Sequence, residues 1–381
     1  MLFCKIASKS SGFTNQIISL ISSIICAIIA NQKVLIIDNF LNDVSKDTYT
    51  PISHIINLRE LNRFLSQTYN VVVIDKNYAV FNVLSANYGT DEHNIDVTEI
   101  IKNSYAKKSG VFIDKNHDFN LIFQKDPCVG YYKRLVLKYE IVTVHEGNQI
   151  FAVAPHYHRK NQIEETYDEC NREDIKIEIG RKSERIYPFI SINDMHYFTN
   201  YTPVFESILS NITYASEFVH NANQSINKWE NFDRQTARTN MIHLRVEPDA
   251  IEFWSKQNKM EYAEFKHIIE SKYIKLIQKY MNKTDQIIIL SGYHENGVLD
   301  FLTKNDYNLF IPDKYYEDRE KNAIVDLIIS KQCNNVFLGC IDNTHWNGST
   351  FSYYISKIID KSVKKVGINL DFIYKPECVF Y

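Results

Sequence analysis

The sequence predicts an α/β protein with two Rossmann-like, doubly wound domains. Residues 2–38 read as a strand, a helix and a second strand, and from residue 239 onward short apolar segments again alternate with helical ones. The strands and the helix near the amino terminus are almost continuous apolar runs. Such runs are typical of a parallel sheet that helices cover on both faces.

The first predicted unit is a β-α-β unit formed by a strand at 2–8, a helix at 16–31 and a strand at 34–38. The loop "SKSSGFTNQ" lies between the first strand and the helix. Open α/β sheets bind ligands at the carboxyl ends of their strands, and the free N–H groups of a helix amino terminus attract phosphate. We expect a phosphate site here, and an ordinary turn with Asn15 as helix cap is the alternative.

The apolar run of this helix, residues 17–30, is shorter than the ~20 residues of a membrane-spanning helix. No basic segment directly precedes the run, and a second strand follows it instead of a cleavage site. We therefore expect no membrane span and no signal peptide. A cytoplasmic location is the corresponding prediction.

Further strands are predicted at 70–75, 110–114 and 150–155. A long amphipathic stretch at 203–227 then ends in a polar segment. We place the domain boundary there, so that residues 1–228 form the amino-terminal domain and residues 229–381 the carboxyl-terminal one. The first domain carries the GxxNQ loop.

In the second domain, strands and helices alternate regularly. A strand with the sequence "NMIHLRV" comes first, and the later elements are expected at 261–280, 286–292, 297–304, 308–312, 319–331, 335–340 and 351–360. Two such domains that face each other across a cleft define the GT-B architecture of nucleotide-sugar glycosyltransferases. A Rossmann oxidoreductase is disfavoured, because no GxGxxG follows any strand.

Composition narrows the functional class. The formal net charge is −3 and the lysines are scattered among acids, so no nucleic-acid partner is expected. The seven cysteines are odd in number and contain no CxxC pair, which fits a reducing compartment. Frequent Asn, Ile, Lys and Tyr with only 11 glycines indicate an AT-rich genome, such as that of a large DNA virus or a protist.

The stretch "HLRVEPD", residues 243–249, is the most informative motif. An arginine at the end of a buried strand is costly unless an anion or a carboxylate satisfies it. A diphosphate would do so, because a guanidinium grips phosphate with two donors. An internal ion pair of Arg245 with Glu247 or Asp249 is the alternative.

A Gly-Ser-Thr turn at residues 348–350 precedes the last well-formed helix. Backbone N–H groups and two hydroxyls at a helix start can bind phosphate, although Ser and Thr are also ordinary helix caps. Asp326 falls inside the amphipathic helix predicted before the preceding strand.

These motifs, in this order, resemble those of the GDP-fucose O-fucosyltransferase superfamily. The resemblance rests on "GFTNQ" before an apolar helix, "HLRVEPDAIEFW" in mid-chain, "AIVDLIIS", and a closing "FLG…STF". HLRxExD with Phe253 four residues later is similar to the plant O-fucosyltransferase-like branch, which includes rhamnosyltransferases that use UDP-rhamnose. The motifs span the chain in this order, but the segment from about residue 50 to residue 200 contains none of them. Two departures from the family pattern are present. The insertion "CIDNTHWNG" is longer than the family usually carries, and "GFTNQ" lacks the second glycine of GxGNQ.

The resemblance implies that the first domain faces the acceptor and that the second binds the nucleotide sugar. It also implies a role for each matching position. Gly12, Phe13 and Asn15 would approach the donor diphosphate, and His243 and Arg245 would hold it. Asp249 and Asp326 would face the nucleoside. The phosphates would be covered by Ser349, Thr350 and Phe351.

The implied activity is inverting transfer of a 6-deoxyhexose, fucose first, from a nucleotide diphosphate sugar to a hydroxyl of a glycan or protein acceptor. Arg245 would stabilise the leaving diphosphate without a metal ion or cofactor, and the sequence has no DxD motif. Glu247 is the candidate base, with Asp38 or Asp43 as substitutes and a base-free route also open. A UDP-rhamnose-dependent rhamnosyltransferase and a non-catalytic nucleotide-sugar or glycan-binding module are the alternatives.

Overall fold

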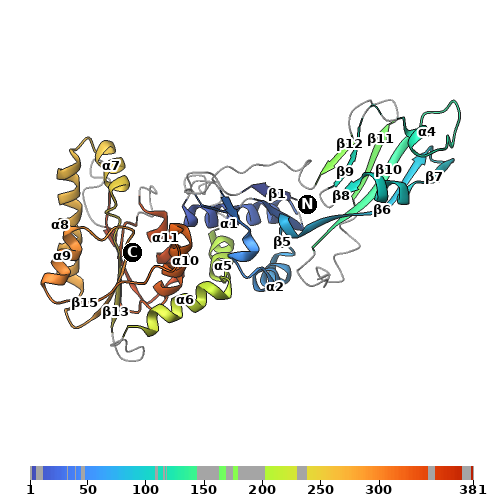
Figure 1. Ribbon diagram of the computed structural model, residues 1–381. Coiled ribbons are helices and arrows are strands. Elements are labelled where there is room, and N and C mark those ends of the chain that lie inside the picture. Colours follow the sequence, from blue (N-terminus) through green and yellow to red (C-terminus); the bar gives the residue numbers. More distant parts are fainter. Residues whose placement is uncertain are drawn as a thin grey trace. The chain divides into compact units, whose positions relative to one another are not determined.

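The computed structural model divides into two compact units. Unit 1 consists of Met1–Ile6, Ser23–Phe40 and Asn62–Tyr187, and unit 2 of Ala7–Ser22, Leu41–Leu61 and Pro188–Tyr381 (Figure 1). This division differs from the predicted boundary between residues 228 and 229, which stays a prediction. The structure describes residues 2–5, 12–31, 33–38, 40–43, 48–107, 110–114, 116, 118–143, 163–168, 175–178, 202–229, 238–341, 348–370 and 379–380.

The predicted β-α-β unit is present at the start of the chain. Strand β1 (Leu2–Lys5), helix α1 (Phe13–Ile29) and strand β2 (Val34–Asp38) follow one another, and β1 pairs in parallel with β2. Strand β5 (Val72–Asp75) adds in parallel to the other side of β2, after helix α2 (Leu58–Tyr69). Among the described residues, no helix is both long and apolar enough to cross a membrane.

The other sheets of unit 1 are antiparallel, so the prediction of a doubly wound fold is wrong for the described residues between 79 and 178. One sheet has the order β11-β10-β6-β7 and another the order β12-β9-β8, and the predicted strand near residue 110 lies in the second. Buried and more exposed residues alternate along much of β6, as in a sheet with one covered face. The strands are β6 (Ala79–Gly89), β7 (Asn94–Asp96), β8 (Ala106–Lys107), β9 (Gly110–Ile113), β10 (Arg134–Thr143), β11 (Ile163–Asp168) and β12 (Ile175–Glu178).

Short elements complete the segments before residue 230. Two 3-10 helices (Ile52–His54 and Lys76–Tyr78), α3 (Thr98–Ile100), a π-helix (Ile101–Tyr105), α4 (Phe119–Ile122) and the hairpin of β3 (Leu41–Asp43) and β4 (Thr48–Thr50) are the small ones. The amphipathic stretch at 203–227 forms two helices, α5 (Thr202–Ser210) and α6 (Ser216–Asn227). The residues between them include Tyr214, which makes an isolated bridge to Ile56.

Unit 2 contains the doubly wound sheet that the sequence predicts for the second half of the chain. Its order is β15-β14-β13-β16-β17-β18, and all pairs are parallel except the last. Counted from β13, the first five strands therefore read 3-2-1-4-5, and the order reverses between β13 and β16. The strands are β13 (Thr239–His243), β14 (Gln286–Leu290), β15 (Asn308–Phe310), β16 (Val336–Gly339), β17 (Lys364–Gly367) and β18 (Val379–Phe380).

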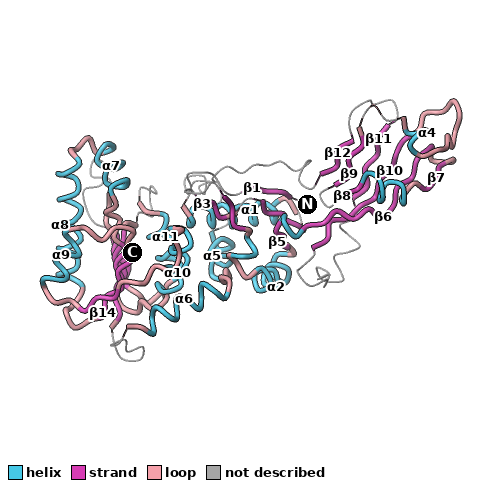
Figure 2. The backbone as a smooth tube through the Cα atoms, viewed as in Figure 1, coloured by secondary structure: helices cyan, strands magenta, loops and turns pink. Residues whose placement is uncertain are grey.

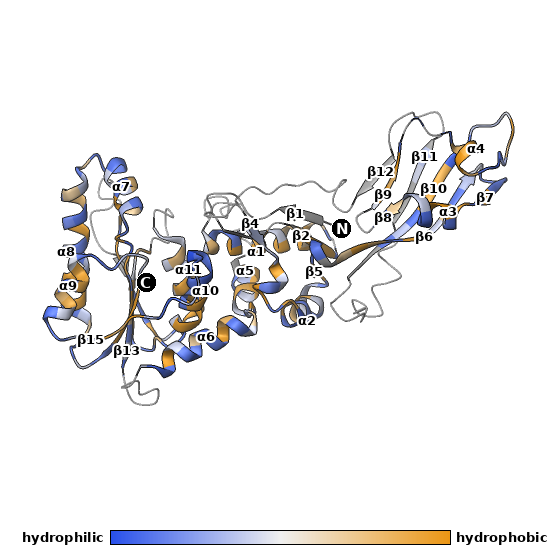
Figure 3. Ribbon diagram, viewed as in Figure 1, coloured by the Kyte–Doolittle hydropathy of each residue, from blue (hydrophilic) through white to orange (hydrophobic). Residues whose placement is uncertain are grey.

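Helices cover both faces of this sheet. They are α7 (Pro248–Gln257), α8 (Tyr262–Tyr280), α9 (Gly297–Lys304), α10 (Arg319–Ser330) and α11 (Thr350–Ile358). Figure 1 shows α8 and α9 on one face and α10 and α11 on the other, and Figure 2 shows the alternation of helix and strand. Polar and apolar residues mix along α8 and α10 (Figure 3), and apolar members such as Phe265, Ile269 and Ile324 are fully buried.

A buried amide network joins three strands at the amino-terminal edge of the sheet. The side chain of Asn240 in β13 donates to Asp285, just before β14, at 3.0 Å. It accepts from the side chain of Asn335, just before β16, at 2.8 Å. Buried polar groups are costly unless they are hydrogen-bonded, so these partners support only one alignment of the strands.

Candidate functional site

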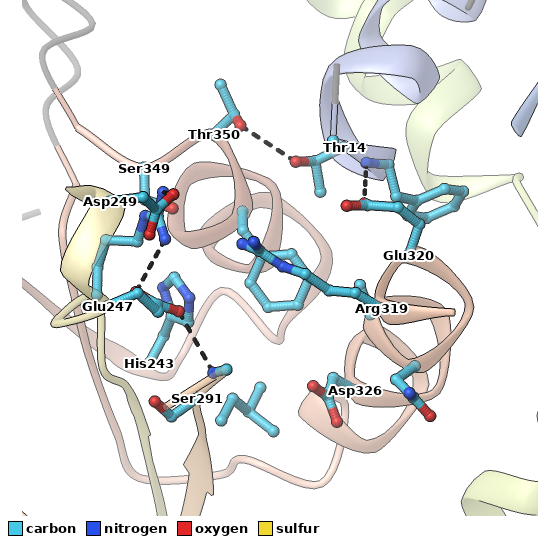
Figure 4. A pocket seen from close by; sticks show the side chains of 18 of the residues that line it. Thr14, His243, Glu247, Asp249, Ser291, Arg319, Glu320, Asp326, Ser349 and Thr350 are labelled. Atoms are coloured by element: carbon cyan, nitrogen blue, oxygen red, sulfur yellow. Dashed lines mark hydrogen bonds and ion pairs between the residues drawn. The ribbon is translucent and has the colours of Figure 1, made fainter. Parts of the chain in front are cut away.

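A pocket of about 980 Å³ lies at the opposite, carboxyl-terminal edge of this sheet, and all its lining residues belong to unit 2 (Figure 4). Its walls follow β13, β14, β15 and β16, at the place where strand order reverses. All residues that the sequence predicts for the site line it, namely Gly12, Phe13, Asn15, His243, Arg245, Glu247, Asp249, Asp326, Ser349, Thr350 and Phe351. Their roles toward a donor stay predictions.

His243, the last residue of β13, is held as a neutral imidazole. Its Nδ1 lies 2.6 Å from Ser352 Oγ, which also accepts the Cys340 N–H at 3.0 Å. Burial lowers the pKa of His243 to about 4, although the Glu247 carboxylate opposes this shift. The ring also packs against Phe351, with 4.9 Å between the centroids. Near pH 7, His243 therefore brings hydrogen-bonding capacity to the pocket without a charge.

Tyr273 of α8 fixes the backbone around the HLR motif. Its buried hydroxyl donates to the His243 carbonyl at 2.8 Å and accepts the Arg245 N–H at 3.2 Å. One side chain thus satisfies two backbone groups where β13 ends and the chain turns into the pocket wall. Tyr273 is a positioning residue for both motif side chains.

Replacing Tyr273 with phenylalanine is expected to lower the free energy of unfolding by about 1–3 kcal/mol, because the two buried backbone groups lose their partner. Urea unfolding followed by circular dichroism measures this change. Tyr262→Phe on the same helix is the matched control, because Tyr262 is exposed, and it should change the free energy by less than about 0.5 kcal/mol. Equal effects of the two variants would contradict the positioning role.

Arg245 is paired inside the protein, as the alternative interpretation of the HLR motif predicted. Its Nη1 lies 2.8 Å from Glu247 Oε2, and its Nη2 lies 3.3 Å from Asp249 Oδ2. Arg245 Nη1 and Glu247 Oε2 are nevertheless buried without an aligned hydrogen bond to any described residue. Glu247 Oε1 accepts the Gly292 N–H at 3.3 Å. The pairing therefore leaves hydrogen-bonding capacity unused in the pocket wall.

The start of α1 lies next to the starts of α10 and α11. The Phe13 N–H donates to the Glu320 carboxylate, whose pKa is raised by burial. Thr14 Oγ1 lies 3.1 Å from Thr350 Oγ1. Because α1 begins at Phe13, Asn15 lies inside the first turn, and the alternative in which Asn15 caps the helix is wrong. The Phe13 N–H, which was predicted to approach a phosphate, is thus hydrogen-bonded to the Glu320 carboxylate of the protein itself.

The Gly-Ser-Thr turn begins α11. Ser349 is the N-cap, and its side chain accepts the Ser352 N–H, so the ordinary capping role is present. Thr350 and Phe351 line the pocket from the first turn of the helix. The insertion before this turn falls largely on residues 342–347, which lie outside the described part of the chain.

Asp326 lines the pocket from the middle of α10. Burial raises its carboxyl pKa to about 7, although the charge of Lys314 opposes the shift. Within the described part of the chain, its carboxylate has no hydrogen-bond or ion-pair partner. A partly buried acid without a partner fits a ligand that supplies hydrogen-bond donors.

The comparisons with known proteins give only distant likenesses. No protein-family model and no curated protein matches the chain. The fucosyltransferase NodZ from Bradyrhizobium has 12% sequence identity and a TM-score of 0.47, over 100% of this chain and 98% of that one. POFUT1 in complex with GDP-fucose has 10% identity and a TM-score of 0.44, over 95% of this chain and 94% of that one.

A third structure, NodZ α-1,6-fucosyltransferase soaked with GDP-fucose, has 12% identity and a TM-score of 0.30. The alignment covers 47% of this chain. It covers 52% of the NodZ chain, so this chain spans about half the length of that structure. At TM-scores below 0.5, these likenesses establish neither the fold family nor the activity of this chain. Its mixed α/β character and its parallel sheet follow from the strand pairing described above.

Sequence reasoning missed several pocket residues. Arg319 and Glu320 stand at the start of α10, after strand β15, and this position at the carboxyl edge of a parallel sheet was the available signal. The other missed lining residues include Thr14, Trp254, Ser291, Gly292, Lys314 and Tyr316. The side chains of Asp38 and Asp43, the substitute bases, and the strand predicted at 150–155 lie outside the described residues.

Proposed function

We propose that this protein is an inverting, metal-independent glycosyltransferase that moves a 6-deoxyhexose, fucose first, from a nucleotide diphosphate sugar to a hydroxyl. One observation carries the proposal. Motif residues from four separate places in the sequence line a single pocket at the switch point of a doubly wound sheet. Pockets at such switch points are the usual ligand sites of open α/β sheets.

The pocket offers the chemistry that a departing diphosphate needs. The Arg245 guanidinium, the neutral His243 and the hydroxyl of Thr350 supply hydrogen-bond donors. Donors that are already oriented stabilise charge that develops on a leaving group, and this stabilisation is strongest where water is excluded. No metal ion is needed in this scheme, because the donors themselves bind the phosphate oxygens.

Asp326 favours guanine as the base. An ionised carboxylate only accepts hydrogen bonds, and guanine presents two adjacent donors, N1–H and the N2 amino group. Uracil presents one N–H between two carbonyl acceptors, and these would repel the carboxylate. The unpartnered Asp326 carboxylate therefore supports a GDP-sugar before a UDP-sugar.

Glu247 stays the candidate base that takes the proton of the acceptor hydroxyl. Its carboxylate is 2.8 Å from Arg245 and would have to leave this ion pair to do so. An arginine-assisted route without a base is therefore the alternative mechanism.

We further propose that the two predicted domains adopt the GT-B arrangement. We also propose that the acceptor is a glycan or a protein, and that the protein is a cytoplasmic, viral enzyme.

The first test measures nucleotide binding by calorimetry. We expect GDP to bind tighter than UDP by roughly tenfold or more, because Asp326 pairs with two donors of guanine. Incubation with GDP-fucose should then release GDP by hydrolysis or transfer. Preference for UDP with turnover of UDP-rhamnose would favour the rhamnosyltransferase, and GDP binding without turnover would favour a binding module. Absence of binding to either nucleotide would refute the proposal.

A further inference from the structure

Arg319 is a cation in the pocket that neither the motifs nor the function proposed above accounts for. It is the first residue of α10, its side chain is exposed, and it lines the pocket. Figure 4 shows it extending into the pocket from α10, which lies across the pocket from Glu247 and Asp249. Within the part of the chain that the structure describes, no hydrogen bond or ion pair joins its guanidinium to another residue.

The acids beside Arg319 are engaged elsewhere. Asp318 caps α10, with its carboxylate accepting the Glu320 N–H at 2.9 Å. The Glu320 carboxylate accepts the Phe13 N–H at the start of α1. Each carboxylate therefore meets a backbone donor and forms no ion pair with Arg319, although the Arg319 charge still acts to lower the pKa of Glu320. The Arg319 side chain faces the pocket.

Arg245 differs from Arg319 in this respect. Arg245 lies between two carboxylates, Glu247 and Asp249, so the cluster as a whole carries a net negative charge. It can donate hydrogen bonds to an anion, but its charge is already balanced. The positive charge that a diphosphate needs must come from the other cations that line the pocket, Arg319 and Lys314, and Lys314 already donates to the Ser291 carbonyl at 3.3 Å.

The position of Arg319 adds to its charge. The N–H groups at the start of α10 carry a partial positive charge that favours anions near this helix end. The Arg319 charge also contributes to the lowered pKa of His243, so it acts electrostatically on the pocket. A guanidinium presents a planar fork of donors that fits two phosphate oxygens at once.

We propose that Arg319 is the residue that binds the diphosphate of the donor through its charge, with Arg245 as a second hydrogen-bond donor. The proposal rests on the proposed function and adds to it a specific anion-binding residue. Arg319 would meet the diphosphate from the α10 side, and Arg245 would meet it from the β13 side. The group recognised is a diphosphate, whichever base and sugar it carries.

The test compares three variants of the full chain by calorimetry, with GDP, inorganic pyrophosphate and guanosine as probes. Arg319→Ala should weaken GDP and pyrophosphate binding by about 10- to 100-fold and leave guanosine binding unchanged. Arg319→Lys should recover part of the loss, because it keeps the charge but loses the fork. Lys331→Ala removes a charge at the other end of α10, away from the pocket, and should bind like the wild type.

The probes separate this inference from the proposed function. If the wild type binds GDP and Arg319→Ala binds it equally well, Arg319 has no role and the proposed function stands. If the wild type binds pyrophosphate through Arg319 but binds GDP and UDP equally well, the anion site is supported. The proposal that Asp326 selects guanine is then contradicted. If Arg319→Ala weakens guanosine as much as GDP, the residue acts on the fold and the inference is overturned.

Discussion

Arg245→Ala is expected to abolish measurable GDP binding and to lower the free energy of unfolding by about 2–4 kcal/mol. The variant leaves the buried Glu247 carboxylate without its ion-pair partner at 2.8 Å. An unpaired buried charge is strongly destabilising, and the partial exposure of Arg245 moderates the loss. The same uncompensated carboxylate would repel an incoming diphosphate, so the effect on binding exceeds that of losing a donor alone.

The double variant Arg245→Ala/Glu247→Gln separates the two consequences. A neutral glutamine removes the unpaired charge, so most of the lost stability should return while GDP binding stays weak. Chemical denaturation and calorimetry on the single and double variants measure both quantities. The assignment of the pocket fails if Arg245→Ala binds GDP and turns over donor as the wild type does.

Asp326→Asn is expected to stabilise the empty protein at pH 8 by roughly 2–3 kcal/mol and to leave its stability near pH 4 unchanged. Burial raises the pKa of Asp326 to about 7 from its ordinary value of 3.8. Between these two values the unfolded chain has released the proton that the folded protein still holds. The stability contributed by this group is therefore present at low pH and lost as pH rises to about 7, and asparagine removes the loss.

Ligand binding should respond in the opposite direction. GDP pairs with the ionised carboxylate, so wild-type affinity should rise with pH up to about 7, and Asp326→Asn should bind GDP more weakly with little pH dependence. Urea unfolding and calorimetry between pH 4 and pH 8 test both statements. Asp306→Asn is the control, because Asp306 is exposed at a positive φ of 59° that asparagine also adopts. Stabilisation by the control as large as that by Asp326→Asn would contradict the explanation.

The carboxyl-terminal sheet could be predicted from the sequence because each of its elements has a local signal. The strand at 286–290 is apolar after its first residue, Gln286, and the helix at 297–304 begins after Asn296, whose side chain caps it. The strand at 110–113 shows the limit of such reasoning. Its apolar run predicts a strand, but an apolar run does not indicate which strand it pairs with or in which direction. In the structure this strand pairs antiparallel with β12 and β8.

In the site too, residues with a local sequence signal could be predicted, and residues placed by long-range contacts could not. His243 and Arg245 could be predicted because their motif joins a buried strand to charged residues within a few positions. Glu320 could not, because its place beside Phe13 depends on a contact across 307 residues of sequence. The ion pairs of Arg245 were foreseen only as one of two alternatives, since the sequence does not say whether a carboxylate or a ligand lies nearer.

The amide network at the amino-terminal edge has a consequence for the opposite edge. Asn240 and His243 share strand β13, and side chains along a strand alternate between its two faces. If β13 slipped by one residue against its neighbours, Leu244 would replace His243 at the strand end, and the imidazole would turn to the other face. The hydrogen bonds of Asn240 therefore fix the register of β13 against its neighbours, and with it the face on which His243 lies. A genetic screen for lost function should find this amide among its hits, although it lies where no substrate reaches.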